Sequence, residues 1–270
     1  MPFDLLLVAE LLLLGVCTGF LAGLLGIGGG MLMVPFMTLI LSARGVDAAL
    51  AVKMAIATSM ATILFTSVSS VRAHHQRGAV RWDIVRTLAP GIALGGLLAG
   101  AGVFSLLKGT TLALVFAVFV AFSATQMLLN RKPAPTRQMP GVAGSLGAGG
   151  VIGFLSGLVG AGGGFISVPF MAWCNVAMHN AVATSAALGF PIALANTVGY
   201  VAGGWSMASP LPGALGYLWL PGLAIIATAS VTTAPLGART AHAMDIAQLK
   251  KVFACTLYGL AAYMLWKSRG

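Results

Sequence analysis

The sequence contains very little charge. Of its 270 residues, only 7% are Asp, Glu, Lys or Arg, whereas 59% are apolar. A water-soluble domain carries roughly 25% charged residues, so this composition cannot cover a water-facing globule and excludes a soluble enzyme. The apolar runs are continuous and lack the alternation of membrane strands. We therefore expect an all-α polytopic membrane protein rather than a β-barrel.

Carboxylates and cysteines are also scarce. Asp and Glu number five against 15 Lys and Arg, and Asp47, Asp83 and Asp245 all lie near the ends of apolar segments. No carboxylate is thus left in mid-membrane for a proton relay. The three cysteines stand alone in apolar segments, which excludes a disulfide framework and a CxxC metal pair. Because the sequence shows no cluster of His, Cys, Asp or Glu at depth, we expect no catalytic residue, no metal, no cofactor and no enzymatic activity.

What the sequence does contain is a series of long apolar runs. A helix that spans a bilayer needs about 20 apolar residues, so this chain can hold roughly eight to ten membrane segments when its loops are short. The expected segments are 4–26, 31–41, 48–71, 87–106 and 110–129, followed by 141–160, 164–176, 181–203, 214–238 and 248–266. Between 72 and 86 we expect a basic loop that contains His74 and His75.

The strongest signal is an internal repeat. Residues 19–37 (GFLAGLLGIGGGMLMVPFM) and 153–171 (GFLSGLVGAGGGFISVPFM) are identical at 13 of 19 positions, at an offset of 134. The triplet Ala-Thr-Ser then recurs at 57–59 and 183–185, at an offset of 126. These matches predict two homologous membrane repeats, 1–130 and 141–270, joined by a basic, proline-containing cytoplasmic linker at 131–140. Duplicated membrane halves are typical of secondary transporters, whose substrate site lies where the repeats meet.

The path of the chain at each glycine cluster has two alternatives. A cluster that only kinks one long helix would give parallel halves, whereas a cluster that reverses the chain would give inverted halves. Loop charges favour inversion: residues 72–86 contain four Arg, but the counterpart 204–216 contains none. The connection 107–109 holds one Lys, whereas its counterpart 239–251 holds three basic residues. Because cytoplasmic loops collect Lys and Arg, we expect inverted repeats, each with a glycine-broken helix or re-entrant hairpin, and a cytoplasmic loop at 72–86.

The glycine clusters themselves have a functional and a structural interpretation. Three successive glycines break a helix and leave backbone polar groups unpaired, which is tolerated at membrane depth only inside protein or beside a wet cavity. The next helix then directs its free N–H groups at the break, which creates an anion site without a charged side chain. We expect Gly28, Gly29 and Gly30 to bind substrate together with Gly162, Gly163 and Gly164. Close helix packing through small residues is the alternative, and a dinucleotide-binding loop is disfavoured because the surrounding pattern is absent.

These residues resemble those of a known family. The doubled cluster GLLGIGGGMLMVP (23–35) and GLVGAGGGFISVP (157–169), the two Ala-Thr-Ser triplets and the segment AHHQRGAVRWD (73–83) are similar to the TauE/SafE family of sulfite and organosulfonate exporters. The resemblance covers nearly the whole chain. It implies transport of small sulfur-containing anions such as sulfite, sulfoacetate or related sulfonates. The residues before the two triplets differ, so the half-sites are not chemically equal.

Several further polar residues lie within the apolar segments. Thr58 and Ser59, matched by Thr184 and Ser185, can bind sulfonate oxygens or bond their own or neighbouring helices. Asn196 is either a ligand or a helix-to-helix contact, because a buried amide needs a partner. Lys53 is an intramembrane cation that either attracts the anion or extends to the interface.

The sequence as a whole predicts a secondary transporter that exports small sulfur-containing anions across the inner membrane. Its expected partners are a small anionic substrate and the lipid bilayer, without nucleic acid, and a homodimer is left open. A channel or carrier for another small anion is the alternative. A membrane-embedded enzyme or an assembly subunit is disfavoured.

Overall fold

The computed structural model describes residues 4–25, 29–129, 137–207, 211–240 and 246–269, of which 24–25, 238–239 and 246–252 are described by backbone alone. The first half of the chain forms α1 (Leu5–Leu25), α2 (Gly30–Ala43), α3 (Ala48–Gln76), α4 (Trp82–Leu97), the π-helical turn η1 (Leu98–Val103), α5 (Phe104–Leu106) and α6 (Gly109–Leu129). The second half forms α7 (Val142–Val159), α8 (Gly164–Trp173), α9 (Met178–Gly203), the strands β1 (Ala214–Leu215) and β2 (Leu218–Trp219), α10 (Leu220–Thr240) and α11 (Ile246–Lys267).

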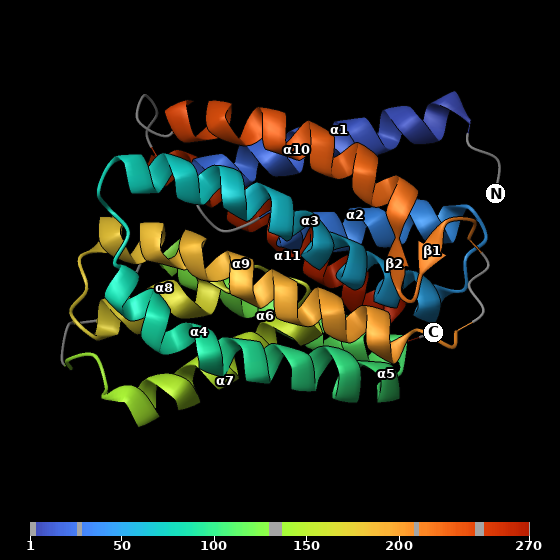
Figure 1. Cartoon of the computed structure of the whole chain (residues 1–270). Coiled ribbons are helices and arrows are strands. Elements are labelled where there is room, and N and C mark those ends of the chain that lie inside the picture. Colours follow the sequence, from blue (N-terminus) through green and yellow to red (C-terminus); the bar gives the residue numbers. More distant parts are fainter. Residues whose placement is uncertain (1–3, 26–28, 130–136, 208–210, 241–245, 270) are drawn as a thin grey trace.

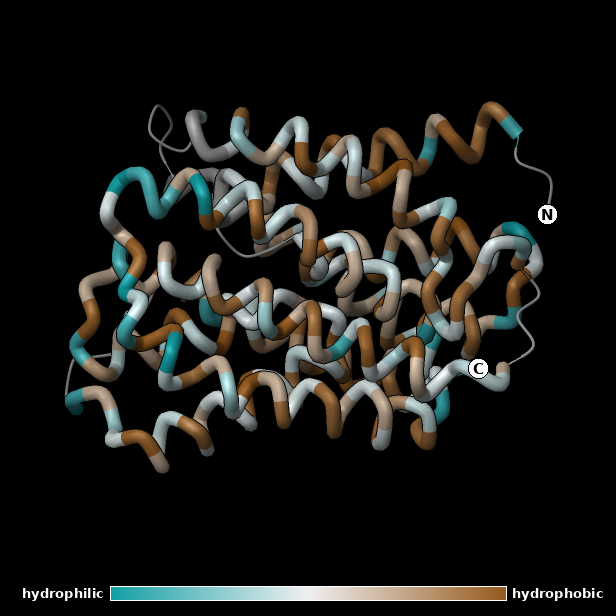
Figure 2. Tube along the Cα trace, in the orientation of Figure 1, coloured by the Kyte–Doolittle hydropathy of each residue, from teal (hydrophilic) through white to brown (hydrophobic). Residues whose placement is uncertain are grey.

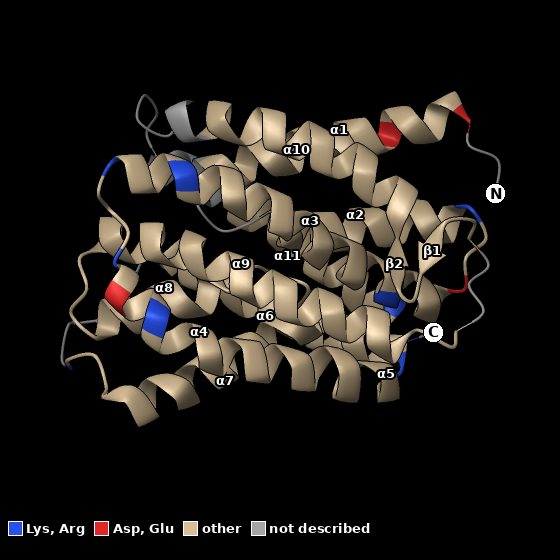
Figure 3. Ribbon diagram, viewed as in Figure 1, with Lys and Arg blue, Asp and Glu red and all other residues tan. Residues whose placement is uncertain are grey.

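The bundle has the surface of a membrane protein. Within the described ranges, seven helices are long and apolar enough to span a bilayer, whereas α2 and α8 are shorter. Large apolar side chains point outward in mid-helix, for example Val118 and Phe122 of α6, which are 62% and 58% exposed. Charged residues gather at the two ends of the bundle and leave its middle uncharged (Figure 3), and apolar residues run along the outer helices (Figure 2). The chain is therefore an all-α polytopic membrane protein, as the composition predicts.

The chain reverses direction between α1 and α2. Arg44, directly after α2, forms ion pairs with Asp4 (2.7 Å) and Glu10 (3.2 Å) at the beginning of α1. The hydrogen bond from this guanidinium lowers the pKa of Asp4 below its ordinary value. In the second half, the backbone N–H of Arg137, just before α7, donates to the carbonyl of Trp173 at the end of α8 (3.3 Å). Each short helix thus returns to the level at which its long partner begins, and the kinked-helix alternative is wrong.

Helices from opposite halves pack against one another (Figure 1). The central pair is α3 and α9, which run side by side in opposite directions, and α1 lies along α10 while α7 lies along α4. The last helices of the two halves, α6 and α11, also pack together. These four helix pairs therefore join the two halves, whereas each short helix packs chiefly on the long helix that follows it, α2 on α3 and α8 on α9.

Small residues make the contact between α7 and α4 close. A Cβ on Gly153 would collide with the carbonyl oxygen of Ile92, and a Cβ on Gly149 would collide with that of Leu88. With no hydrophobic driving force between helices in lipid, such short backbone separations supply the packing energy. The structural role of Gly153 in helix packing follows from this contact.

Two local features differ from the sequence expectations. α3 continues through His75 to Gln76, so only residues 77–81 form the connection to α4, and the long basic loop is wrong. Basic residues in the last turn of a helix interact favourably with the helix dipole, which explains why α3 does not end with its apolar run. The apolar run expected at 214–238 begins instead with a β-hairpin in which Ala214 pairs with Trp219. Its turn begins at Gly216 with φ of 57°, the left-handed conformation that such two-residue turns require.

The α7–α4 contact gives a direct test of close packing. We expect Gly153→Ala to lower the free energy of unfolding by about 1–3 kcal/mol, since overpacking has costs of that size, and to lower the melting temperature in detergent. Gly147→Ala on the same helix is the matched control, because a Cβ at Gly147 meets nothing within 4 Å. Equal melting temperatures for the two variants would contradict the close packing.

Candidate functional site

Both glycine clusters interrupt the helices with left-handed backbone. Gly29 precedes α2 with φ of 62°, and Gly163 precedes α8 with φ of 74°. L-residues with a side chain rarely adopt these values, so glycine is required at both positions. Gly30 and Gly164 are the first residues of α2 and α8 and are buried, whereas Gly28 lies outside the described residues. The two predicted breaks therefore exist, and the first helical residue after each is buried.

The two interruptions meet inside the protein. A Cβ on Gly30 would collide with the carbonyl oxygen of Gly160 and would lie 3.2 Å from the Cα of Ala161. The hydroxyl of Ser59, in α3, donates to the same carbonyl of Gly160 at 3.2 Å. A residue of the first Ala-Thr-Ser triplet thus supports the glycine break of the second half, and the N-terminus of α2 lies against that break.

The two threonines of the triplets form a reciprocal pair of bonds between the halves. The hydroxyl oxygen of Thr58 accepts a hydrogen bond from the backbone N–H of Trp219, just before α10 (3.1 Å). The hydroxyl oxygen of Thr184 accepts one from the backbone N–H of Arg81, just before α4 (3.0 Å). Each threonine therefore holds the beginning of a helix from the opposite half, and one acceptor position of each hydroxyl is occupied by protein.

A cavity of about 60 Å³ lies between α3, α9, α1 and α10 beside the second glycine break. Gly162 and Ser185 line it, and so do Ala22 and Gly23 of α1. Its polar side chains are those of Thr66, Ser67, Ser69, Ser70, His74, Arg77 and Ser185. A water molecule needs roughly 10–15 Å³ of such space, so the cavity has room for a small oxyanion.

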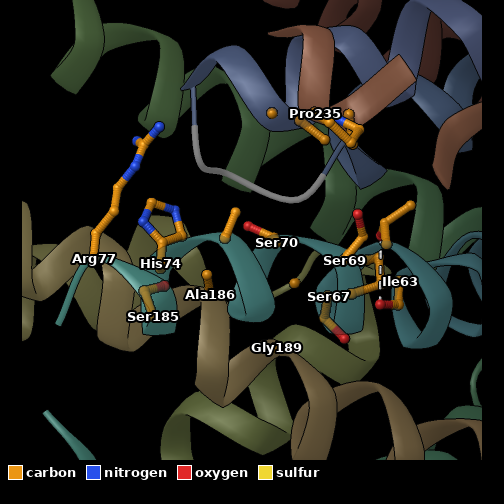
Figure 4. A pocket seen from close by; sticks show the side chains of 16 residues that line it. Ile63, Ser67, Ser69, Ser70, His74, Arg77, Ser185, Ala186, Gly189 and Pro235 are labelled. Carbon is orange, nitrogen blue, oxygen red and sulfur yellow. Dashed lines mark hydrogen bonds between the residues drawn. The ribbon is translucent and has the colours of Figure 1, made fainter. Parts of the chain in front are cut away.

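The cavity is electropositive at one end. His74 and Arg77 lie at one end of it, and Ser67 and Ile63 lie at the other (Figure 4). Arg77 is exposed, so this end is the mouth of the cavity. No Asp or Glu occurs among the lining residues that the structure describes. The arrangement of hydroxyl groups and the Arg77 guanidinium, without a carboxylate among the described lining residues, suits an anion.

Some of the predicted site residues lie away from this cavity. Asn196, which is fully buried, donates through Nδ2 to the carbonyl oxygens of Ile192 (2.8 Å) and Gly153 (3.3 Å) and thereby links α9 to α7. The ammonium group of Lys53 donates to the carbonyl of Ser105 at 3.0 Å and lies 5.2 Å from the ring centroid of Tyr217. Lys53 is thus at the hairpin end of α3, and Arg77 follows the other end. Ser185 lines the cavity while its hydroxyl contacts that of Ser167 at 2.8 Å.

The sequence interpretation missed the hydroxyl groups on the second half of α3. Thr66, Ser67, Ser69 and Ser70 are four hydroxyl residues within five positions of an otherwise apolar segment. Two of them are buried, and the hydroxyl of Ser67 also donates to the carbonyl of Leu64 (3.0 Å). The density of hydroxyl groups at that depth is the signal that would have located the cavity.

Interrupted helices that begin inside a polytopic bundle, beside a polar cavity, define a membrane transporter rather than an enzyme. The family profile "Sulfite exporter TauE/SafE" matches residues 11–264. The chain belongs to this family. A "Probable membrane transporter protein" of Haemophilus influenzae is 34% identical over 258 residues, which cover 95% of this chain and 97% of that relative. A second protein so named, from Methanocaldococcus jannaschii, is 27% identical over 97% of this chain and 96% of its own length. No solved structure gives a significant match.

The reciprocal threonine bonds can be tested by removing one acceptor. We expect Thr58→Val to lower the free energy of unfolding by about 1–3 kcal/mol, the cost of leaving a buried donor unsatisfied, because the N–H of Trp219 loses its partner. Thr184→Val should have a smaller effect, since Arg81 is exposed. Thr228→Val is the control, because Thr228 is exposed and its hydroxyl donates within its own helix to Ala224. Melting curves in detergent measure all three, and an unchanged Thr58→Val melting temperature would refute the assignment.

Proposed function

We propose that this protein is a secondary transporter that exports small sulfur-containing anions, such as sulfite, sulfoacetate or related sulfonates, across the inner membrane. The observation that carries the proposal is the cavity beside Gly162. Hydroxyl groups line this cavity, its mouth is basic, and its described lining residues include no carboxylate. The N-terminus of α8 lies next to it. An oxyanion would accept hydrogen bonds from these hydroxyls and from backbone N–H groups of the glycine break.

We also propose that the halves are inverted repeats. Three observations support this: the chain reverses at each break, α3 and α9 run in opposite directions, and Thr58 and Thr184 make equivalent bonds to opposite halves. In transporters built this way, the substrate binds where the repeats meet. The cavity lies at that position, since α1 and α3 form one side of it and α9 and α10 the other.

We infer the direction of transport from the distribution of charge. The end of the bundle at Arg72, Arg77, Arg81 and Arg86 is the cytoplasmic end if the positive-inside rule holds. The mouth of the cavity at Arg77 then faces the cytoplasm, which is where an exporter loads. An anion that leaves a negative interior gains about 2.3 kcal/mol per charge for each 100 mV. Export therefore needs no proton-carrying carboxylate in the membrane.

The predicted ligand residues remain proposals. Gly162 and Ser185 line the cavity, and Gly163 and Gly164 begin the helix beside it. In this conformation Gly29, Gly30, Thr58, Ser59 and Thr184 support the breaks and the helix beginnings around the cavity. Gly28 and Lys53 are further proposed ligands, and Lys53 would act at the hairpin end of α3, away from this cavity.

The substrate class can be tested with purified protein in proteoliposomes. We expect outward flux of sulfite or sulfoacetate that increases when the interior is made negative, and thermal stabilisation by the transported anion through mass action. Taurine, thiosulfate, sulfate and chloride complete the panel. A response to chloride alone would make the protein a carrier for another small anion, and flux that ignores the membrane potential would contradict the proposed driving force.

The basic mouth can be tested with a matched pair of arginines. We expect Arg77→Gln to raise the KM for the transported anion about tenfold, since one hydrogen bond to a charged group is worth about 1.5 kcal/mol or more. Arg72→Gln removes the same charge from an exposed position that does not line the cavity, and its KM should stay close to that of the parent. An equal rise of KM in both variants would reduce the role of Arg77 to general surface charge.

A further inference from the structure

Residues of the first repeat that line the cavity have equivalents in the second repeat, and those equivalents are buried by packing instead of lining a cavity. The offset of 126 that aligns the two Ala-Thr-Ser triplets pairs Ser70 with Asn196 and His74 with Tyr200. The offset of 134 that aligns the glycine clusters pairs Ala22 with Ser156. We call Ser156, Asn196 and Tyr200 the second half-site. The side chains at the three equivalent positions in the first half line the open cavity.

The second half-site is closed by its own side chains. Asn196 and Tyr200 are 0% exposed and Ser156 is 1% exposed. Asn196 lies over Gly96 of α4 and Gly157 of α7, and a Cβ on either glycine would collide with its amide. The hydroxyl of Tyr200 donates to the carbonyl of Gly157. These contacts close the second half-site with α9 against α4 and α7.

The closed arrangement leaves two polar atoms without partners. Oδ1 of Asn196 and Oγ of Ser156 have no hydrogen-bond partner among the described residues, although both are buried. A buried polar group without a partner is unfavourable, and a half-satisfied polar cluster is worse than an apolar one. Ser156 faces the second glycine break, because a Cβ on Gly163 would lie 3.1 Å from its Oγ. The hydrogen bonds of Asn196 to α7 and α9 give no reason for leaving these two oxygen atoms without partners among the described residues.

The chemistry of the second half-site also suits an anion. Ser156, Asn196 and Tyr200 each have an N–H or O–H donor, and none of them carries a carboxylate. In this conformation Asn196 and Tyr200 donate to backbone carbonyls, so they become available to an anion only when the half-site opens, whereas the hydroxyl of Ser156 has no such partner among the described residues. The difference from the open cavity is charge: Tyr200 stands where the first half has His74, and Gly203 stands where it has Arg77. An anion would therefore be bound at the second half-site by neutral donors only.

We propose that the second half-site is a second anion-binding station, which opens when the transporter faces the opposite side of the membrane. The proposal rests on the proposed transport function and assigns its release side. Opening must separate the end of α9 from the hairpin, because the rings of Tyr200 and Tyr217 both pack on that of Phe104, with centroid distances of 4.4 and 5.4 Å. The basic first cavity loads the anion, and the neutral second half-site holds it less tightly and releases it.

The test compares cysteines at equivalent positions. The background is a Cys17→Ala, Cys174→Ala, Cys255→Ala protein, in which Ala22→Cys reports the open cavity and Ser156→Cys, a nearly isosteric change, reports the second half-site. A membrane-impermeant sulfonated maleimide is applied to oriented proteoliposomes, with sulfoacetate as the anion because it does not react with thiols. Asn196→Cys is a second reporter in case Ser156→Cys folds poorly. Val198→Cys is the control, since Val198 is 51% exposed on the apolar surface of α9.

We expect Ala22→Cys to be labelled from the face that carries Arg77, and Ser156→Cys and Asn196→Cys only from the opposite face. A sulfoacetate gradient that slows the labelling of Ala22→Cys should increase the labelling rate of Ser156→Cys and Asn196→Cys about fivefold or more, and the reverse gradient should do the opposite, as expected for coupled sites. Val198→Cys should not react from either face.

Two results separate this proposal from the transport function. If the background protein transports sulfoacetate but neither Ser156→Cys nor Asn196→Cys is labelled from any face, the second station is refuted while the transport function stands. If both are labelled from the face opposite Arg77 although no sulfur-containing anion is transported, the second half-site opens as proposed and the substrate assignment fails.

Discussion

The structure depends on one constraint: backbone that leaves the helical ladder within a bilayer must find partners inside the protein. Two glycine clusters interrupt helices in this chain, and helices of both halves pack around the described residues beside them. Gly29 and Gly163 supply the left-handed backbone that lets a short helix begin beside each break. The reversal of the chain and the helix pairs formed between the halves place these two interruptions inside the bundle, and the cavity lies beside the second.

Enclosure also explains the arrangement of polar side chains. Ser59 donates to the carbonyl of Gly160, while Thr58 and Thr184 accept from backbone N–H groups that begin α10 and α4. Each of these bonds joins one half to the other. A transporter whose halves move relative to one another must break such contacts and form others. The hydroxyls that stabilise this conformation lie at the interface between the halves, where these contacts would change. Support of the fold and contact with an anion are compatible roles for the same residues.

The sequence predicted the features that depend on local composition. Apolar length located the membrane helices, and the repeat located both breaks, with Gly163 at the second. It did not predict that α3 extends to Gln76, because the last turn of a helix is set by its end contacts rather than by hydropathy. The β-hairpin before α10 was also missed, since Leu218 and Trp219 are apolar and continue into a helix.

The position of the cavity could not be predicted for a different reason. The partner of a hydroxyl within a membrane depends on which helix lies opposite, and Thr58 and Ser67 look alike in the sequence. Only the packing of α3 on α9 shows that one holds the beginning of α10 while the other lines a cavity. Asn196 likewise had two interpretations that the sequence could not separate. The structure shows its contact with α7 together with an unsatisfied oxygen, so one residue combines both features.

Interrupted helices and hydroxyl groups, rather than a cluster of arginines, form the proposed anion site. The most direct measurement is an experimental structure of the protein with selenite, whose selenium can be located by its anomalous scattering. We expect a selenium peak beside Gly162 and Ser185, within hydrogen-bond reach of the α3 hydroxyl groups. A peak only among the exposed arginines near Arg72, with the cavity empty, would contradict it.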